Sequence, residues 1–212
     1  MTTATIELSE FERDALTELV NIGVSRAAAS LRKMVGAQVL LSVPSVDIIG
    51  RKAAAALIGE RETDHLVAVR QDFTGAFSGR ALLIFPLSNS IELVHAVIGD
   101  NLGADDIAGM EDEALSETGN IILNGCLATM ANMLQQSLTM SLPEVLRGDG
   151  AQLLSGLGSG PGDDGLVLFL YINFSVSERD IRGYIALLMD LPSLASLKVL
   201  VGDFISRVMD DN

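Results

Sequence analysis

The sequence predicts an α+β fold with pseudo-twofold symmetry, a tandem repeat of one α-β-α-β-β-type unit. Polar and turn-forming residues recur 99 positions further along the chain, in the same order and at the same spacing. Helical and strand-like apolar patterns also follow one another in the same order in both halves. Because 49% of the 212 residues are hydrophobic, the chain can bury a sizeable core. We expect a single domain over residues 1–212, with repeats at about 8–99 and 107–210. The recurring pairs are Asp14 and Glu113, Glu18 and Glu117, Asn21 and Asn120, and Pro44 and Pro143.

The first repeat opens with a long helix that the sequence predicts over residues 9–34. Ser9 and Glu12 have the spacing of a reciprocal helix cap. Leu19 and Ile22 belong to a series of apolar residues at helical spacing, which predicts one buried face. Gly36 suits the left-handed residue that ends many helices.

The rest of the first repeat alternates strands and short helices. Pro44 cannot donate to a sheet ladder, so it indicates an edge or a break within its strand. The glycine of Thr74-Gly75 suits the tight turn of a hairpin. The glycines at 99 and 103 mark the boundary between the halves. The predicted elements are a strand at 37–49, a helix at 51–59, hairpin strands at 66–73 and 76–85, and a helix at 88–98.

The second repeat follows the same order until a glycine-rich stretch at residues 148–165. This stretch predicts a mobile loop or linker. It contains a GxGxG string, but because no strand leads into it and no helix leaves it, a phosphate cradle is not predicted. Pro192 suits the first turn of the closing helix. The predicted elements are a helix at 110–136 and strands at 139–146, 166–176 and 182–189, followed by a helix at 192–209.

Charge and composition exclude several classes of partner. Fourteen Lys and Arg against twenty-eight Asp and Glu give a net charge of −14, which opposes binding to nucleic acid or to an anionic membrane surface. Proteins or cations are therefore the favoured partners. The start of the chain lacks the pattern of a secretory signal, and no apolar run reaches the roughly 20 residues that span a bilayer. We expect a cytoplasmic protein without membrane insertion.

The recurring polar residues form a stripe on each long helix. Spacings of four and three residues keep Asp14, Glu18 and Asn21 on one face, and the same holds for Glu113, Glu117 and Asn120. A carboxylate beside a carboxamide can bind a cation and orient a water molecule. A solvated polar face is the alternative, and the presence of Glu and Asn in both halves favours a site. Because an amide is no general base and neither helix carries a Ser-His-Asp or Cys-His arrangement, a self-sufficient hydrolase is excluded.

Other reactive side chains suggest no further site. His65 and His95 stand far apart in the sequence and lack flanking ligands, so no metal site is predicted for them. Cys126, the single cysteine, excludes an intramolecular disulfide. It lies in an apolar helical stretch, where we expect it to be buried and unreactive.

The motif in both halves resembles the CheC, CheX and FliY family of chemotaxis phosphatases. The family pattern is Asp or Ser, three residues, Glu, two residues, Asn, twenty-two residues and Pro. The first copy fits fully, whereas the second has Glu113 where the pattern has Asp or Ser. Two copies in a chain of this length resemble CheC in particular. The resemblance implies one central sheet that both repeats share, with the two motif helices exposed on the surface.

The resemblance also implies a function, which is dephosphorylation of the aspartyl phosphate on a CheY-type receiver domain. Asn21 and Asn120 would hold the attacking water, and Glu18 and Glu117 would pair with a lysine of the receiver. The receiver would supply Mg²⁺, so this chain is expected to bind no cofactor or metal itself. The motif-supporting residues would be Asp14, Glu113, Pro44 and Pro143.

A second function stays open from the sequence. The chain could be a non-catalytic adaptor that docks on a receiver, on a CheD-like deamidase or on the flagellar switch. Proteins of the family can bind CheD through a surface away from the motif helices, so a CheD-like deamidase is also an expected partner of the phosphatase.

Overall fold

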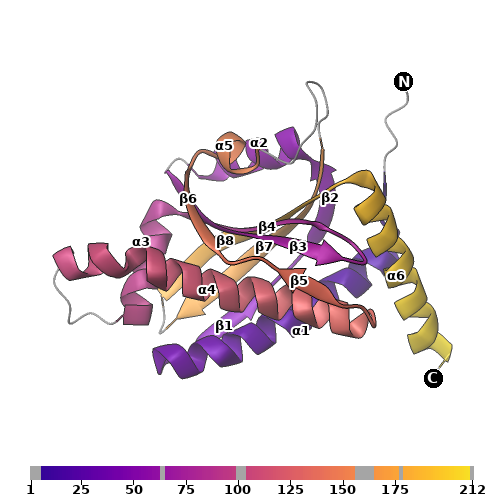
Figure 1. Cartoon of the computed structure of the whole chain (residues 1–212), viewed down its shortest axis with the longest axis horizontal. Coiled ribbons are helices and arrows are strands. Elements are labelled where there is room, and N and C mark those ends of the chain that lie inside the picture. Colours follow the sequence, from indigo (N-terminus) through magenta and orange to yellow (C-terminus); the bar gives the residue numbers. More distant parts are fainter. Residues whose placement is uncertain (1–5, 63–64, 99–103, 156–164, 177–178, 211–212) are drawn as a thin grey trace.

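The computed structural model describes residues 6–62, 65–98, 104–155, 165–176 and 179–210, which form a layered arrangement around an antiparallel sheet (Figure 1). Helices α1 and α4 lie on one face of the sheet, and α2 and α5 lie on the other. The described helices are α1 (Glu10–Val35), α2 (Arg51–Arg61), α3 (Leu87–Ile98), α4 (Ala104–Met133), α5 (Gly150–Leu153) and α6 (Leu191–Asp210). The described strands are β1 (Val39–Ser42), β2 (Val46–Gly50), β3 (Leu66–Gly75), β4 (Gly79–Pro86), β5 (Leu138–Met140), β6 (Glu144–Gly148), β7 (Leu166–Val176) and β8 (Arg179–Met189).

The sheet exchanges short strands between the two parts of the chain. Its order is β1-β7-β8-β4-β3-β5, with β2 also paired to β7 and β6 also paired to β3. The early strands β1 and β2 therefore pair with the late strand β7, and the late strands β5 and β6 pair with the early strand β3. Neither part of the chain can complete its sheet alone.

The mixed helix-and-sheet class is confirmed, and most element positions agree with the sequence to within a few residues. Local signals explain the agreement. Helix α1 begins with a complete capping box between Ser9 and Glu12 and ends at Gly36, whose φ is 70°. The glycines at 99 and 103 and the GxGxG string lie outside the described residues.

Several bounds differ from the predictions for physical reasons. The predicted strands at 37–49 and 139–146 are each two strands, separated at 43–45 and 141–143, because a proline cannot continue the ladder. The hairpin connection falls at 76–78. Gly75 instead ends β3, where an added Cβ would lie 2.4 Å from the carbonyl oxygen of Ser137. Helix α4 begins before residue 110, and α5 lies in the stretch that was predicted as a loop.

The core has two parts, one on each face of the sheet. The larger part fills the space between the sheet and α1, α4 and α6, and it includes Leu16, Leu31, Phe73 and Leu127. The smaller part lies under α2 and α5 around Ile58. In the part of the chain that the structure describes, no helix is long and apolar enough to cross a membrane.

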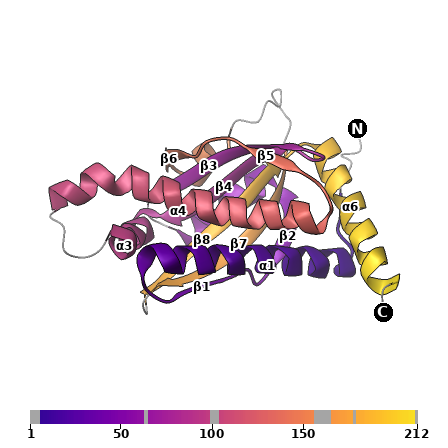
Figure 2. The same cartoon turned by 60° about the horizontal axis from the view of Figure 1, so that its bottom comes forward.

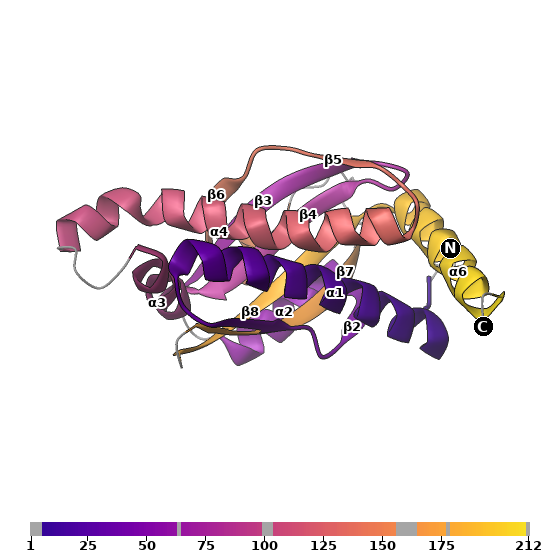
Figure 3. The same ribbon diagram turned by 90° about the horizontal axis from the view of Figure 1, so that it is seen from below.

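Helices α1 and α4 run side by side beneath the sheet, and Figure 2 and Figure 3 show them from two directions. They approach closely at Gly23 and Gly125. A Cβ added at Gly23 would lie 2.8 Å from both the Cα of Cys126 and the carbonyl oxygen of Gly125. The helix backbones are therefore in direct contact, which fixes the position of both motif helices against the sheet.

Replacing Gly23 with alanine should destabilise the protein. The new methyl group meets backbone atoms that cannot move aside, and overpacking of this kind costs about 1–3 kcal/mol. Urea denaturation of Gly23→Ala measures the loss. Gly202→Ala in α6 is the matched control, because nothing lies within 4 Å of its added Cβ. The control should unfold at the same or a higher urea concentration, and equal behaviour of the two variants would contradict the helix contact.

Cys126 should be inert in the folded protein. Its side chain is fully buried, as the sequence predicted, and burial raises the pKa of its thiol to about 12. Because the thiolate is the nucleophile, a thiol reagent at pH 8 should react only after denaturant is added. Rapid labelling of the native protein would contradict the packing of α4.

Candidate functional site

The first motif lies on α1 and at the gap between β1 and β2. Asp14 and Glu18 are exposed to solvent, and Asn21 is half-buried. Pro44 lies in the gap, directly after the buried Val43. The helix and the strand gap are brought together by Asn21 itself.

The side chain of Asn21 makes two hydrogen bonds to the backbone of Val43. Its Nδ2 donates to the Val43 carbonyl oxygen at 2.8 Å, and the Val43 N–H donates to its Oδ1 at 2.8 Å. Val43 lies where the ladder of β7 is interrupted, between Ser42 and Val46. The amide of Asn21 therefore satisfies buried backbone groups that a strand would otherwise pair.

A shallow depression of about 430 Å³ opens beside the first motif. Glu18, Asn21 and Arg26 contribute to its lining, together with Ile22, Ser25 and Ala29. A larger groove of about 750 Å³ shares Ser25 and Ala29 and extends to Arg32 and Lys33. The carboxylate and the amide thus face one space, with cationic side chains next to it.

The second motif lies on α4, but its asparagine is held differently. Glu113 and Glu117 are exposed and Asn120 is half-buried, as in the first motif. Asn120 Oδ1 accepts hydrogen bonds from Gln71 Nε2 at 3.0 Å and from Asn124 Nδ2 at 2.6 Å. Each motif therefore presents a carboxylate on the helix surface one turn before a half-buried amide.

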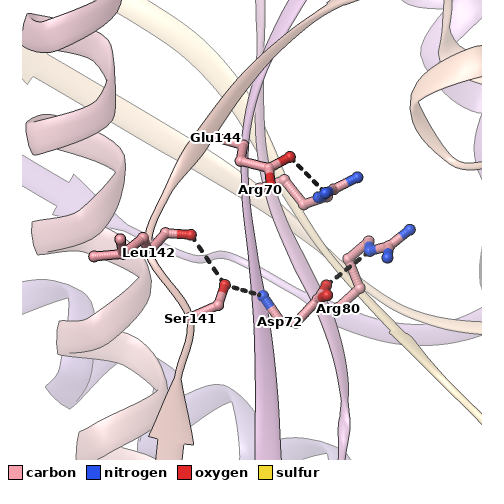
Figure 4. A network of polar contacts seen from close by, with 6 residues as sticks. All are labelled: Arg70, Asp72, Arg80, Ser141, Leu142 and Glu144. Carbon is pink, nitrogen blue, oxygen red and sulfur yellow. Dashed lines mark hydrogen bonds and ion pairs between the residues drawn. The ribbon is translucent and has the colours of Figure 1, made fainter.

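The gap between β5 and β6 is attached to β3 through Ser141 and Asp72 (Figure 4). The Ser141 N–H donates to the Asp72 carbonyl at 2.8 Å, and the Asp72 N–H donates to Ser141 Oγ at 2.9 Å. Gln71 Nε2 donates to the Ser141 carbonyl at 2.9 Å. Leu142, next to Pro143, is consequently 86% exposed, whereas Val43 is 1% exposed.

Ion pairs flank this attachment on both sides. Arg70 pairs with Glu144 across β3 and β6, and Arg80 pairs with Asp72 across β4 and β3. Figure 4 shows both pairs around the Ser141 contacts. The pair of Arg70 with Glu144 links β3 to the residue that follows Pro143.

Sequence reasoning missed Gln71 and Ser141. Gln71 is 1% exposed and lies on β3 between inward-facing Val69 and Phe73. A polar residue in an otherwise apolar alternating series is the signal that could have identified it, because such a side chain needs hydrogen-bond partners. Ser141 carries no comparable signal, since its role depends on the pairing of β5 with β3.

The chemistry available at each motif is limited to charge and hydrogen bonding. Within the described residues, no three His, Cys, Asp or Glu side chains gather closely enough to hold a metal ion. Neither motif contains a nucleophile beside a base. The arrangement can pair with a cation through the carboxylate and position a small polar molecule through the amide.

Replacing Asn21 with alanine should cost more stability than replacing Asn120. Asn21→Ala leaves the N–H and C=O of buried Val43 unpaired, a loss of about 2–4 kcal/mol. Asn120→Ala leaves Gln71 bonded to the Ser141 carbonyl, so we expect a loss of about 1 kcal/mol or less. Urea denaturation of both variants measures the difference. Equal losses would contradict the unequal bonding of the two amides.

The chain is similar to several known proteins in sequence and in fold. No protein-family model matches the chain. The chain is 30% identical to the flagellar motor switch phosphatase FliY of Bacillus subtilis over 141 residues, which are 66% of this chain and 36% of FliY. It therefore spans about a third of the length of FliY. It is 24% identical to the CheY-P phosphatase CheC of Bacillus subtilis over 204 residues, which are 92% of this chain and 96% of CheC.

Solved structures share the whole fold. The crystal structure of Thermotoga maritima FliY has a TM-score of 0.71 at 14% identity, over 95% of this chain and 99% of that one. The middle domain of FliM from Vibrio alginolyticus has a TM-score of 0.62 at 11% identity, over 87% of this chain and 99% of that one. The chain is thus similar in sequence to CheC and FliY, and it shares the fold of Thermotoga maritima FliY and of the FliM middle domain.

Proposed function

We propose that the chain is a phosphatase that removes the phosphoryl group from the phosphoaspartate of a CheY-type receiver domain. One observation carries the proposal. An exposed glutamate stands one turn before a half-buried asparagine on α1 and again on α4, each beside an interrupted edge of the sheet. The relatives FliY and CheC bear the names of phosphatases, and that of CheC specifies CheY-P.

The proposed reaction is hydrolysis of an acyl phosphate. Water attacks the phosphorus, the bond between phosphorus and the aspartate oxygen breaks, and inorganic phosphate leaves with the aspartate carboxylate restored. This chemistry requires an oriented water and charge neutralisation more than a protein nucleophile. At each motif, the amide can orient the water and the carboxylate can pair with a cation.

Each motif residue has a proposed role. Asn21 and Asn120 are the catalytic residues that hold the water in line, and Glu18 and Glu117 pair with a lysine of the receiver. The supporting residues are Asp14, Glu113, Pro44 and Pro143. Mg²⁺ belongs to the receiver, so the chain itself needs no cofactor. Because receivers act inside the cell, the proposal includes a cytoplasmic location.

An adaptor without catalysis is the second candidate. The fold shared with FliM favours it, because in the FliG–FliM complex from H. pylori a protein of this fold is bound to another protein, FliG. A receiver, the flagellar switch or a CheD-like deamidase would be its partner. Binding without faster phosphate loss distinguishes this candidate from the phosphatase.

The test follows loss of phosphate from a phosphorylated CheY-type receiver of the same genome in the presence of Mg²⁺. Wild type should accelerate the loss. Asn120→Ala should reduce the second site's contribution to kcat by about tenfold or more with little change in KM, because only water positioning is removed. Glu117→Arg should raise KM instead, since it places a cation opposite the lysine of the receiver. Chelation of Mg²⁺ should abolish the acceleration.

Asn132→Ala is the matched control on the same helix. Asn132 is exposed and lies outside the motif, so this variant should behave as wild type. If wild type binds the receiver but leaves its phosphate lifetime unchanged, the phosphatase proposal fails for that receiver and the adaptor takes its place.

A further inference from the structure

We infer that Gln71 is a positioning residue for Asn120, which orients the amide of the second site for reaction. The inference builds on the proposed function. It adds a residue of the central sheet to the second site and makes the two sites chemically unequal.

Gln71 lies at the one place on β3 from which it can reach both the motif helix and the strand gap. The ladder between β3 and β5 ends at Phe73 with Met140, and the ladder between β3 and β6 starts at Arg70 with Glu144. Gln71 and Asp72 lie opposite residues 141–143 of the interruption. The side chain of Gln71 is 1% exposed and points to the α4 side of the sheet.

The contact with Ser141 fixes which atom of Gln71 faces Asn120. A backbone carbonyl only accepts hydrogen bonds, so the Gln71 atom 2.9 Å from the Ser141 oxygen must be the donor Nε2. The same Nε2 lies 3.0 Å from Asn120, so the Asn120 atom that meets it must be the acceptor Oδ1. Asn124 donates to that oxygen as well. The orientation of the Asn120 amide is thus set by the sheet.

This orientation leaves the donor end of Asn120 available. Both side-chain hydrogen bonds that the described residues make with the Asn120 amide go to Oδ1, and neither involves Nδ2. An N–H group that points away from its anchored oxygen can donate to a water or to a phosphoryl oxygen. In the first motif, by contrast, both Nδ2 and Oδ1 of Asn21 are engaged by Val43.

The corresponding position on β7 carries an apolar residue, which is what packing alone favours at this place in the sheet. Ile172 lies opposite the gap between β1 and β2, two residues before Phe174, as Gln71 lies two residues before Phe73. Ile172 is 2% exposed and belongs to the apolar core. An apolar side chain therefore fits this place in the sheet, and it cannot hold an amide.

Gln71 also leaves a buried polar atom without a partner. Its Oε1 is buried and makes no hydrogen bond within the described residues. An unpaired buried acceptor destabilises a fold, so stability alone does not explain this residue. What Gln71 contributes is the pair of hydrogen bonds that its Nε2 donates to Asn120 and Ser141.

Helix α4 lies close enough to β3 for this contact because of Gly119. A Cβ added there would lie 2.5 Å from side-chain atoms of Val69, two residues before Gln71 on the same strand. The equivalent residue of α1 in the repeat is Val20, which is buried. The closer approach at Gly119 brings Asn120 within reach of Gln71.

The test isolates the second site with Glu18→Arg, which removes the docking carboxylate of the first site and leaves the Asn21 contacts to Val43 in place. In this background, Gln71→Met removes the amide and keeps the length of the side chain. We expect kcat for receiver dephosphorylation to fall about tenfold with KM unchanged, because binding is kept and orientation is lost. The melting temperature should change little, because the loss of the hydrogen bonds to Ser141 and Asn120 is offset by removal of the unpaired Oε1.

The matched control places Gln71→Met in the Glu117→Arg background, where only the first site works. Activity should then be unchanged. A crystal structure of Gln71→Met should show the Asn120 side chain in a new orientation or in several.

The outcomes separate this inference from the proposed function. If Glu18→Arg protein is active and Gln71→Met leaves its kcat unchanged, the positioning role is wrong while the phosphatase stands. If Gln71→Met lowers activity equally in both backgrounds, or lowers the melting temperature in step with activity, Gln71 is structural only. If wild type itself does not accelerate phosphate loss, the proposed function fails and the inference falls with it.

Discussion

The exchange of short strands across the sheet is the constraint on which the rest of this structure depends. Strands β1 and β2 need β7, and β5 and β6 need β3, so neither part of the chain can pair its backbone without the other. The exchange places each strand gap beside a motif helix from its own part of the chain. The contact of α1 with α4 at Gly23 and Gly125 then fixes both helices beneath one sheet.

Each gap creates backbone groups that lose their ladder partners, and the two motifs satisfy them by different means. In the first motif, the asparagine that the sequence singles out serves the backbone of Val43. In the second, Ser141 and Gln71 hold the gap against β3, which releases the motif asparagine from that task. The same sequence motif is therefore held by different hydrogen bonds in its two copies. The difference follows from the residue opposite each gap, Gln71 or Ile172.

This difference links stability to the proposed chemistry. An amide that is needed to pair buried backbone groups is rigid, and one of its two N–H donors and one lone pair of its oxygen are already used. An amide held only through its oxygen keeps its N–H donors available, and its supporting Gln71 has a buried oxygen without a hydrogen bond among the described residues. Precise orientation at a reactive group often carries such a local cost in stability.

The sequence by itself determined the class of fold, the motif helices and the burial of Cys126, because apolar periodicity, helix caps and repeated polar residues act over a few neighbouring positions. It also indicated a break at Pro44, although it predicted one strand over 37–49, and it gave no such indication at Pro143. Only the tertiary structure decided which strands pair, and with them the partners of Asn21 and Asn120. Gln71 is 49 positions from Asn120 in the sequence, and Ser141 is 70 positions from Gln71. Hydrogen bonds between such distant residues follow from the register of the completed sheet, which no local pattern specifies.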